Sequence, residues 1–185
     1  EHFSLLLNKN NPKQKNITIQ NIGLTSFLYK NKAMSKSKLI IHENSQVLEK
    51  SIFKGEITIG DSTVIQPLAS ILATNGPIII GEKNIIEEFV IIENLNENGE
   101  PLIIGDKNTF EVQSTFRVDK NVTITDFCSI GTGCIVPEGE ELQPQTVVFG
   151  KNSDKRIGCE KSQNTEDELD FLLKVFPKYH KILKN

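Results

Sequence analysis

The chain has 185 residues, which is long enough for one domain with a real hydrophobic core. Its hydrophobic content is 37%, it has no Trp and two Tyr, and Ile recurs throughout, a composition typical of a β-rich protein filled with branched aliphatic side chains. The net charge of -3 divides unevenly: residues 1–33 hold five Lys and one Glu, whereas residues 34–185 hold 16 basic and 23 acidic residues. Because nucleic acids are bound by clustered Lys and Arg, the acidic body argues against a nucleic-acid partner.

The cysteines and the apolar runs indicate the compartment. Cys128, Cys134 and Cys159 form neither an even set nor a Cys-x-x-Cys pair, so the sequence gives no sign of a disulfide framework or structural zinc, and a reducing compartment fits best. The runs FSLLL and LTSFLY near the start are too short to span a membrane and lack the layout of a signal peptide. We therefore expect a cytoplasmic protein without membrane insertion.

Residues 1–34 differ from the rest of the chain. They are rich in Asn and Lys and show no repeat, and the only Met of the chain, Met34, stands just before the repeats begin. We interpret this segment as a disordered or non-native extension that precedes the folded domain.

From residue 35 to residue 150 the sequence repeats with a period of six. The heptamers IGDSTVI, IGEKNII and IGDKNTF begin at Ile59, Ile80 and Ile104, and steps of six fall on apolar anchors, with two restarts and one slip of two. Neither a helical period of 3.6 nor a plain alternation describes this pattern. The eighteen anchors are Ile41, Val47, Phe53, Ile59, Ile65, Ile71, Ile80, Ile86, Ile92, Ile104, Phe110, Phe116, Val118, Ile124, Ile130, Val136, Leu142 and Val148.

A second column of residues supports the first. Four residues after an anchor the side chain is usually small, which is the hexapeptide rule of a triangular parallel β-helix: the anchor fills the prism and the small residue lies inside a corner. Eighteen anchors predict an all-β solenoid, a parallel β-helix of about six coils, and hexapeptide prisms of this kind are usually left-handed. The small residues are Ser45, Ser51, Thr63, Ala69, Ser114, Cys128, Cys134 and Thr146.

The two restarts indicate insertions at one corner of the prism. Each restart follows a proline, Pro77 or Pro101, that stands three residues before the next Ile. Proline fixes an extended backbone at the start of a strand, and Gly or Asn tolerates the unusual backbone of a turn. We expect the loops at residues 73–76 and 94–100 to bulge from the same edge, one above the other.

The end of the chain predicts a linker over residues 151–164 and a helix over residues 165–184. A capping box opens the helix at Thr165, and Pro177 is expected to kink or interrupt it. An isolated helix of this length is only marginally stable in water, so its apolar stripe is expected to pack on one flat face of the solenoid. The stripe consists of Leu169, Leu172, Leu173 and Phe176.

Hexapeptide prisms often host enzymes, so the histidines are candidates for catalysis or metal binding. Solenoid carbonic anhydrases need three His around a metal, and solenoid acyltransferases use a His as general base. Here His2 lies in the extension, His42 follows the first anchor, and His180 lies in the terminal helix, so they do not form a ligand set on successive coils. Cys128 and Cys134 stand in the small-residue column and are interpreted as inert core residues. We expect no catalytic residue, metal or cofactor.

The carboxylates that follow each Ile-Gly pair are the remaining candidates for chemistry. Asp61, Glu82 and Asp106 stand at equivalent positions of successive coils, and a ladder of carboxylates is able to bind a cation. The favoured interpretation is that these acids, like Glu87 and Glu88, are solvated residues of turns.

An outer apolar stripe is the candidate binding surface. The residue before an anchor points outward, and at the face of the Ile-Gly repeats these residues are Ile40, Thr58, Ile79 and Ile103. The neighbouring face presents Val64 and Ile85, and one helix cannot cover both stripes. Monomers seldom leave a contiguous apolar patch in water, so the uncovered stripe is expected to bind a partner. The candidate partner interface is Ile40, Val64, Ile79, Ile85 and Ile103.

Three blocks of sequence go beyond the generic repeat. EITIGDSTVIQPLASILATNGPIIIGEKNIIEE, PLIIGDKNTFEV and LDFLLKVFPKYHKILK resemble the dynactin subunit 6 family over about residues 35–184. The chain departs from that family in its first 33 residues and between Val112 and Val122, where it is shorter than the family usually is and where the phase slips. Our hypothesis is therefore that this chain lacks part of a coil in that stretch, relative to the family.

The resemblance implies a non-enzymatic structural and adaptor subunit of the dynactin pointed-end complex in the cytoplasm and cytoskeleton. Its implied partners are the sister β-helix subunit, an actin-related protein and a large pointed-end subunit, with indirect links to dynein, to cargo and to microtubule-based transport. The alternative from another class is a trimeric hexapeptide-repeat acyltransferase or a carbonic anhydrase-like enzyme with sites between protomers.

Overall fold

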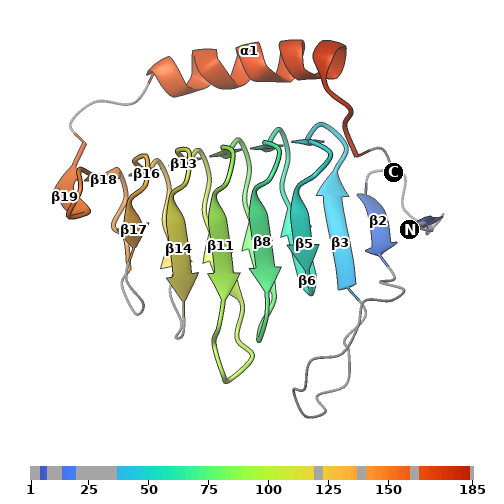
Figure 1. Cartoon of the computed structure of the whole chain (residues 1–185), viewed down its shortest axis with the longest axis horizontal. Helices are drawn as coiled ribbons and strands as arrows, with labels where there is room; N and C mark the ends of the chain where they lie inside the picture. The colour runs from blue at the N-terminus through green and yellow to red at the C-terminus, as the bar shows by residue number, and fades with distance from the viewer. Residues whose placement is uncertain are drawn as a thin grey trace.

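The computed structural model describes residues 5–7, 14–19, 37–118, 123–136, 141–158 and 163–183. The chain winds into a triangular parallel β-helix whose coils stack side by side, and the helix α1 (Gln163–Tyr179) runs along the stack (Figure 1). The all-β solenoid predicted from the sequence is therefore confirmed.

The strands form three sheets, one on each side of the prism. In order of hydrogen bonding, the first sheet is β1 (Leu5–Leu7), β2 (Gln14–Ile19), β3 (Ser37–His42), β6 (Glu56–Ile59), β9 (Ile78–Ile80), β12 (Leu102–Ile104) and β15 (Thr123–Ile124). The second is β19 (Asp154–Ile157), β18 (Thr146–Phe149), β16 (Ser129–Ile130), β13 (Thr109–Phe110), β10 (Ile85–Ile86), β7 (Val64–Ile65) and β4 (Gln46–Val47). The third is β17 (Ile135–Val136), β14 (Thr115–Val118), β11 (Ile91–Asn94), β8 (Ser70–Ala73) and β5 (Ile52–Lys54).

Each coil visits the first, second and third sheets in turn. We call the turn from the first to the second sheet the first corner, the next turn the second corner, and the return to the first sheet the third corner. Parallel pairing from β3 to β15 in the first sheet and from β5 to β17 in the third makes about five full coils. The pairing of Leu142 with Ile124 and the strand β18 begin a sixth coil.

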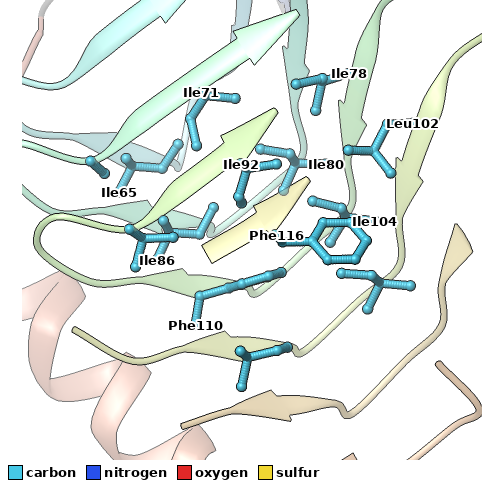
Figure 2. Packing of buried hydrophobic residues seen from close by; sticks show 14 of the residues in the cluster. Ile65, Ile71, Ile78, Ile80, Ile86, Ile92, Leu102, Ile104, Phe110 and Phe116 are labelled. Carbon is cyan, nitrogen blue, oxygen red and sulfur yellow. The ribbon is translucent and has the colours of Figure 1, made fainter. Parts of the chain in front are cut away.

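The predicted anchors fill the prism. Every anchor except the partly buried Phe53 is fully buried, and Figure 2 shows Ile65, Ile86 and Phe110 converging on the same interior. Burying one such side chain stabilises the fold by about 1.5–3 kcal/mol relative to leaving it in water. The longer strands of the first sheet add a second inward residue that the period of six did not mark. These additional core residues are Leu39, Ile57, Ile78 and Leu102.

The first corner contains a ladder of polar side chains. Asn84 and Asn108 occupy the column where small residues were predicted, and both are fully buried. Nδ2 of Asn84 donates to the carbonyl oxygen of Gly105 at 2.9 Å, and Oδ1 of Asn84 accepts from the backbone nitrogen of Asn108 at 2.8 Å. Oδ1 of Asn108 accepts from the backbone nitrogen of Cys128 at 2.7 Å. Because these amides replace backbone bonds that the turn interrupts, they join successive coils.

The repeated Ile-Gly pair follows from the close approach of the coils at the same corner. A Cβ placed on Gly81 would lie 2.7 Å from the carbonyl oxygen of Gly105, closer than side-chain carbons approach oxygen atoms. The equivalent Gly60 meets Gly81 in the same way. Glycine is therefore required sterically at this position of the coil.

The third corner contains all the length variation of the solenoid. The loops at residues 73–76 and 94–100 both bulge there. The backbone nitrogen of Asn75 in the first loop donates to the carbonyl oxygen of Asn94 at the start of the second loop, at 3.0 Å. The predicted stacking of these loops is confirmed. The slip of two after Phe116 is a third insertion at this corner, because Phe116 pairs with Val136 and Ile104 pairs with Ile124 in unbroken register. No strand is missing between the described residues on either side of the slip.

The first strands differ from what the sequence predicted. β1 and β2 lie inside the segment interpreted as an extension, and β2 pairs antiparallel with β3 from Gln14 opposite His42 to Ile19 opposite Ser37. Neither strand follows the period of six, because an antiparallel strand added at an edge does not belong to a coil. The rest of residues 1–34 lies outside the described part of the chain.

The terminal helix starts two residues before the predicted boundary and is shorter than predicted. It begins at Gln163, so Thr165 is inside it, and it ends at Tyr179, with Pro177 accommodated in its last turn. Beyond the helix, Ile182 pairs antiparallel with Leu48, and the backbone nitrogen of Leu183 donates to the carbonyl oxygen of Val47 at 2.8 Å. The end of the chain thus adds to the edge strand β4 instead of extending the helix to residue 184.

Candidate functional site

The outward side of the first sheet carries an exposed apolar stripe. Ile40, Thr58, Ile79 and Ile103 stand directly opposite one another on successive strands. Ile79 and Ile103 are each 42% exposed, and Ile40 is partly buried. The structure therefore brings three of the five predicted interface residues together on one flat face. We call Ile40, Ile79 and Ile103 the outer stripe.

The other two predicted interface residues are not accessible. Val64 and Ile85 pair side by side in the second sheet, and both are fully buried. They form a second hydrophobic cluster with Leu169 and Leu172 of the terminal helix. The prediction that Val64 and Ile85 bind a partner is wrong for this chain, because α1 covers their face.

The terminal helix is attached by apolar and polar contacts. Leu169 and Leu172 are buried against Leu48 and its neighbours, while Leu173 and Phe176 pack at the border of the same cluster. Two polar contacts fix the register of the helix along the prism. Nε2 of Gln46 donates to the carbonyl oxygen of Leu173 at 2.6 Å, and Nζ of Lys107 lies 2.7 Å from Oε1 of Glu166.

The carboxylates beside the outer stripe join neighbouring coils. Oδ1 of Asp106 accepts from the backbone nitrogen of Glu82 at 2.7 Å, and Oδ1 of Asp126 accepts from the backbone nitrogen of Asp106 at 2.8 Å. These acids therefore act as hydrogen-bond acceptors for backbone groups that the turn leaves without a strand partner. They border the first sheet with negative charge along the first corner.

Asp61 and His42 lie in contact at the start of this border. Oδ1 of Asp61 lies 2.7 Å from Nδ1 of His42, and it also accepts from Nδ2 of Asn44 at 2.8 Å. Burial alone would raise the pKa of Asp61, but hydrogen bonds from Asn44 and Ser62 and the neighbouring imidazole outweigh burial, so the pKa lies below its usual 3.8. The carboxylate is therefore held in its charged form at neutral pH.

The other histidines stand in different surroundings. The ring of His180 packs edge-on against Phe176 with 5.1 Å between ring centroids, and His2 lies outside the described residues. Over the described ranges, no group of three His, Cys, Asp or Glu side chains is placed to hold a metal ion.

The cysteines of the small-residue column lie in the core. Cys128 and Cys134 are buried and reduced, and Cys159 lies outside the described residues. Burial raises the pKa of the Cys128 thiol above its usual value, although hydrogen bonds from neighbouring groups oppose the rise. A protonated, buried thiol is a poor nucleophile, which agrees with a packing role for Cys128.

A second exposed apolar surface, which the sequence pattern did not predict, lies at the second corner. Leu68 and Phe89 are 41% and 50% exposed, and both stand three residues after an anchor. The backbone at that position of the coil has a positive φ, which favours Gly, Asn or a flexible polar residue. A large apolar residue three positions after an anchor was the signal that would have identified this surface.

No helix among the described residues is both long and apolar enough to cross a membrane.

The fold and its corner chemistry define a hexapeptide-repeat protein: a left-handed parallel β-helix with a packed C-terminal helix. No family model matches the chain. Its fold is similar to that of a hexapeptide transferase family protein from Anaplasma phagocytophilum, with a TM-score of 0.56, 12% identity, and coverage of 77% of this chain and 93% of that one. At that identity the likeness concerns the fold alone.

Two sequence relatives are closer. Dynactin subunit 6 of Xenopus tropicalis is 38% identical over 162 residues, covering 75% of this chain and 81% of the relative. Dynactin subunit 6 of Nematostella vectensis is 35% identical over 172 residues, covering 80% of this chain and 94% of the relative. The chain belongs to the dynactin subunit 6 family.

Proposed function

We propose that the chain is a non-enzymatic structural and adaptor subunit of the pointed-end complex of dynactin. In this role it supports dynein-based transport and cargo attachment along microtubules, in the cytoplasm and on the cytoskeleton. Its membership of the dynactin subunit 6 family supports this proposal, and the exposed outer stripe is the single structural observation that carries it.

The outer stripe suits a binding surface for a protein partner. A β-helix face is flat and rigid, so apolar side chains that stand out from it lose little conformational entropy when they are buried. The corner carboxylates at one edge supply a polar border, which resembles the rim of a protein interface. The partners proposed for this face are the other pointed-end subunits: the sister β-helix subunit, the actin-related protein and the large subunit.

Three sheet edges at the ends of the solenoid are covered by added segments, whereas the third sheet ends at β5 and β17 without a further strand among the described residues. β2 pairs with the outer edge of β3, β19 pairs with the outer edge of β18, and residues 181–183 bond to β4. Each of these added segments is antiparallel, so it satisfies the backbone groups of an edge strand without continuing the coil. These three edges are therefore not open to a partner strand.

The rival function is that of a trimeric hexapeptide-repeat acyltransferase or carbonic anhydrase-like enzyme. Its best residue is His42, which is paired with Asp61 at the first corner and has a partly exposed side chain. A general base held by a carboxylate is chemically reasonable. The family membership favours the structural subunit, because the relatives that define it are dynactin subunits.

A substitution on the outer stripe tests the proposal. Ile79→Lys places a charge in the middle of the stripe, where the side chain is 42% exposed and points away from the core. The matched control is Ile135→Lys, which makes the same change on the third sheet at a residue that is 58% exposed. Both variants are expected to keep the circular dichroism spectrum and melting midpoint of the unchanged chain.

The readout is the recovery of pointed-end subunits with the tagged chain from cells. Ile79→Lys is expected to remove at least one pointed-end subunit from the purified material, whereas Ile135→Lys retains the full set. If both variants fold and recover the same subunits as the unchanged chain, the outer stripe does not bind these partners. If even the unchanged chain recovers none of them, the proposed function itself is wrong.

A further inference from the structure

The second corner presents two large apolar side chains on neighbouring coils. β7 and β10 pair in register, with Val64 opposite Ile85, so Leu68 and Phe89, each four residues further on, stand at equivalent places of adjacent coils. Adjacent coils are about 4.8 Å apart, so these exposed side chains are near neighbours. Both have a left-handed backbone, with φ of 66° and 60°.

The fold does not require apolar residues at these two positions. The same place on other coils is occupied by Lys50, Gln113 and Gly133, all with a positive φ. A left-handed backbone is unfavourable for bulky side chains, and exposure to water adds no stabilisation from burial. Neither local geometry nor the core therefore explains Leu68 and Phe89.

The first corner provides a contrast. Phe127 occupies the corresponding position there, and Nζ of Lys107 lies over its ring, 5.1 Å from the centroid. Lys107 is itself held by Glu166 of the helix. The aromatic ring at the first corner thus has a partner within the chain, and Phe89 is the more exposed of the two rings.

The terminal helix adds a third exposed apolar residue, Phe171, which is 61% exposed. Glu166 contacts Lys107 of the first corner, and Glu168 stands about 200° further round the helix, so the flank of Glu168 faces the second corner. In agreement, the charge of Glu168 contributes to raising the pKa of Glu87. Phe171 follows Glu168 by three residues, which is nearly one turn and a rise of about 4.5 Å, close to the spacing of one coil. The helix runs from the late coils toward the first (Figure 1). Glu166 contacts Lys107 on a later coil and Leu173 contacts Gln46 on the first, so Phe171 lies between these two levels.

Carboxylates border this apolar surface on the side of Phe89, whereas Lys50 stands beside Leu68 on the first coil. Glu87 and Glu88 immediately precede Phe89, Glu111 stands on the next coil, and Glu168 approaches from the helix. Burial raises the pKa of Glu87, and repulsion from Glu168, Glu111 and Glu88 raises it further, against the effect of a hydrogen bond from the backbone nitrogen of Val112. The surface therefore combines exposed apolar groups with a concentrated negative charge.

We propose that Leu68, Phe89 and Phe171, which we call the corner patch, dock a segment of a neighbouring protein whose apolar side chains are flanked by Lys or Arg. Apolar groups on the partner cover the corner patch, and the flanking cations offset the repulsion among the four carboxylates. The inference rests on the proposed function, because the neighbour is taken to be another subunit of the same complex. It adds a second contact to the outer stripe, on a different side of the prism.

Site-specific photo-crosslinking in cells tests the corner patch. The full-length tagged chain carries the photoreactive residue p-benzoylphenylalanine in place of Phe89, and a second version carries it in place of Phe171. A control version carries it in place of Phe149, which is 42% exposed and lies in β18 outside the patch. After illumination and purification, mass spectrometry identifies the crosslinked segment and the co-purified dynactin subunits separately.

The expected result is that the Phe89 and Phe171 versions crosslink to one and the same segment of another subunit, rich in Lys or Arg beside apolar residues, and that the Phe149 version does not. Adding Glu88→Lys to the Phe89 version is expected to lower the crosslinking yield about tenfold, since it places a like charge at the rim of the contact. Its melting midpoint serves as the check on folding.

Three outcomes would overturn the proposal: crosslinking no stronger than in the Phe149 control, crosslinking to a second copy of the chain, or crosslinking to a segment without basic residues. Each of these can occur while dynactin subunits still co-purify, in which case only the corner patch is refuted. Loss of all dynactin subunits from every version would instead refute the proposed function.

Discussion

Truncation of Leu172 measures how strongly the terminal helix is attached to the prism. Leu172 is 9% exposed and packs in one cluster with Leu48, Val64 and Ile85 of the second sheet. Leu172→Ala removes three buried carbon atoms. At about 0.8 kcal/mol for each buried carbon group, this lowers the free energy of unfolding by about 2 kcal/mol. Leu→Ala substitutions in cores cost about 2–5 kcal/mol when a cavity remains. The cavity here lies between a helix and a sheet, where neighbouring side chains partly fill it. We therefore expect the free energy of unfolding to fall by about 2–3 kcal/mol.

The neighbouring residue provides the matched control. Phe171 precedes Leu172 in the same helix but is 61% exposed, so Phe171→Ala is expected to change the free energy of unfolding by less than about 0.5 kcal/mol. Urea unfolding followed by far-ultraviolet circular dichroism measures both variants against the unchanged chain. Equal effects of the two substitutions would refute the packing argument and would mean that the helix is not held through Leu172.

Two further predictions concern pH and the first strands. Because the pKa of Glu87 is raised above its usual 4.5 in the folded chain, its ionised form lowers stability at neutral pH, and this loss disappears as the pH falls through the folded-state pKa toward 4.5. Glu87→Gln is therefore expected to raise the melting midpoint at pH 7 and to lose that advantage near pH 4; a constant difference across this range would contradict the reasoning. Removing residues 1–33 takes away β2, which covers the edge of β3, so the melting midpoint is expected to fall; an unchanged midpoint would instead support the disordered or non-native extension inferred from the sequence.

The interior of the prism was predictable because its residues obey one spatial rule. An anchor at every sixth position points inward whatever the rest of the coil contains, and this rule placed Ile41, Ile65 and Ile130 in the core. It missed Ile57 and Ile78, because a strand of three or four residues has room for a second inward residue that a period of six does not mark. The column of corner residues was predicted as small, although buried Asn is equally suitable when its amide binds the neighbouring coil.

The surface was less predictable. The stripes of Ile79 and Val64 look equally apolar in the sequence, and the choice of the face that the helix covers depends on contacts between distant residues, such as Gln46 with Leu173. The slip after Phe116 suggested a missing part of a coil, since a two-residue insertion at a corner and a deletion elsewhere give the same change of phase. Only the pairing of Phe116 with Val136 distinguishes them.

Sedimentation of the chain from cell extract shows whether it is a dynactin subunit. We expect the chain, detected with a tag on an otherwise full-length protein, to migrate with the other dynactin subunits in one large complex, and affinity purification to recover them in constant ratio across the peak. A chain that instead migrates alone as a small homotrimer, free of dynactin subunits, would refute the structural role and would favour the trimeric enzyme.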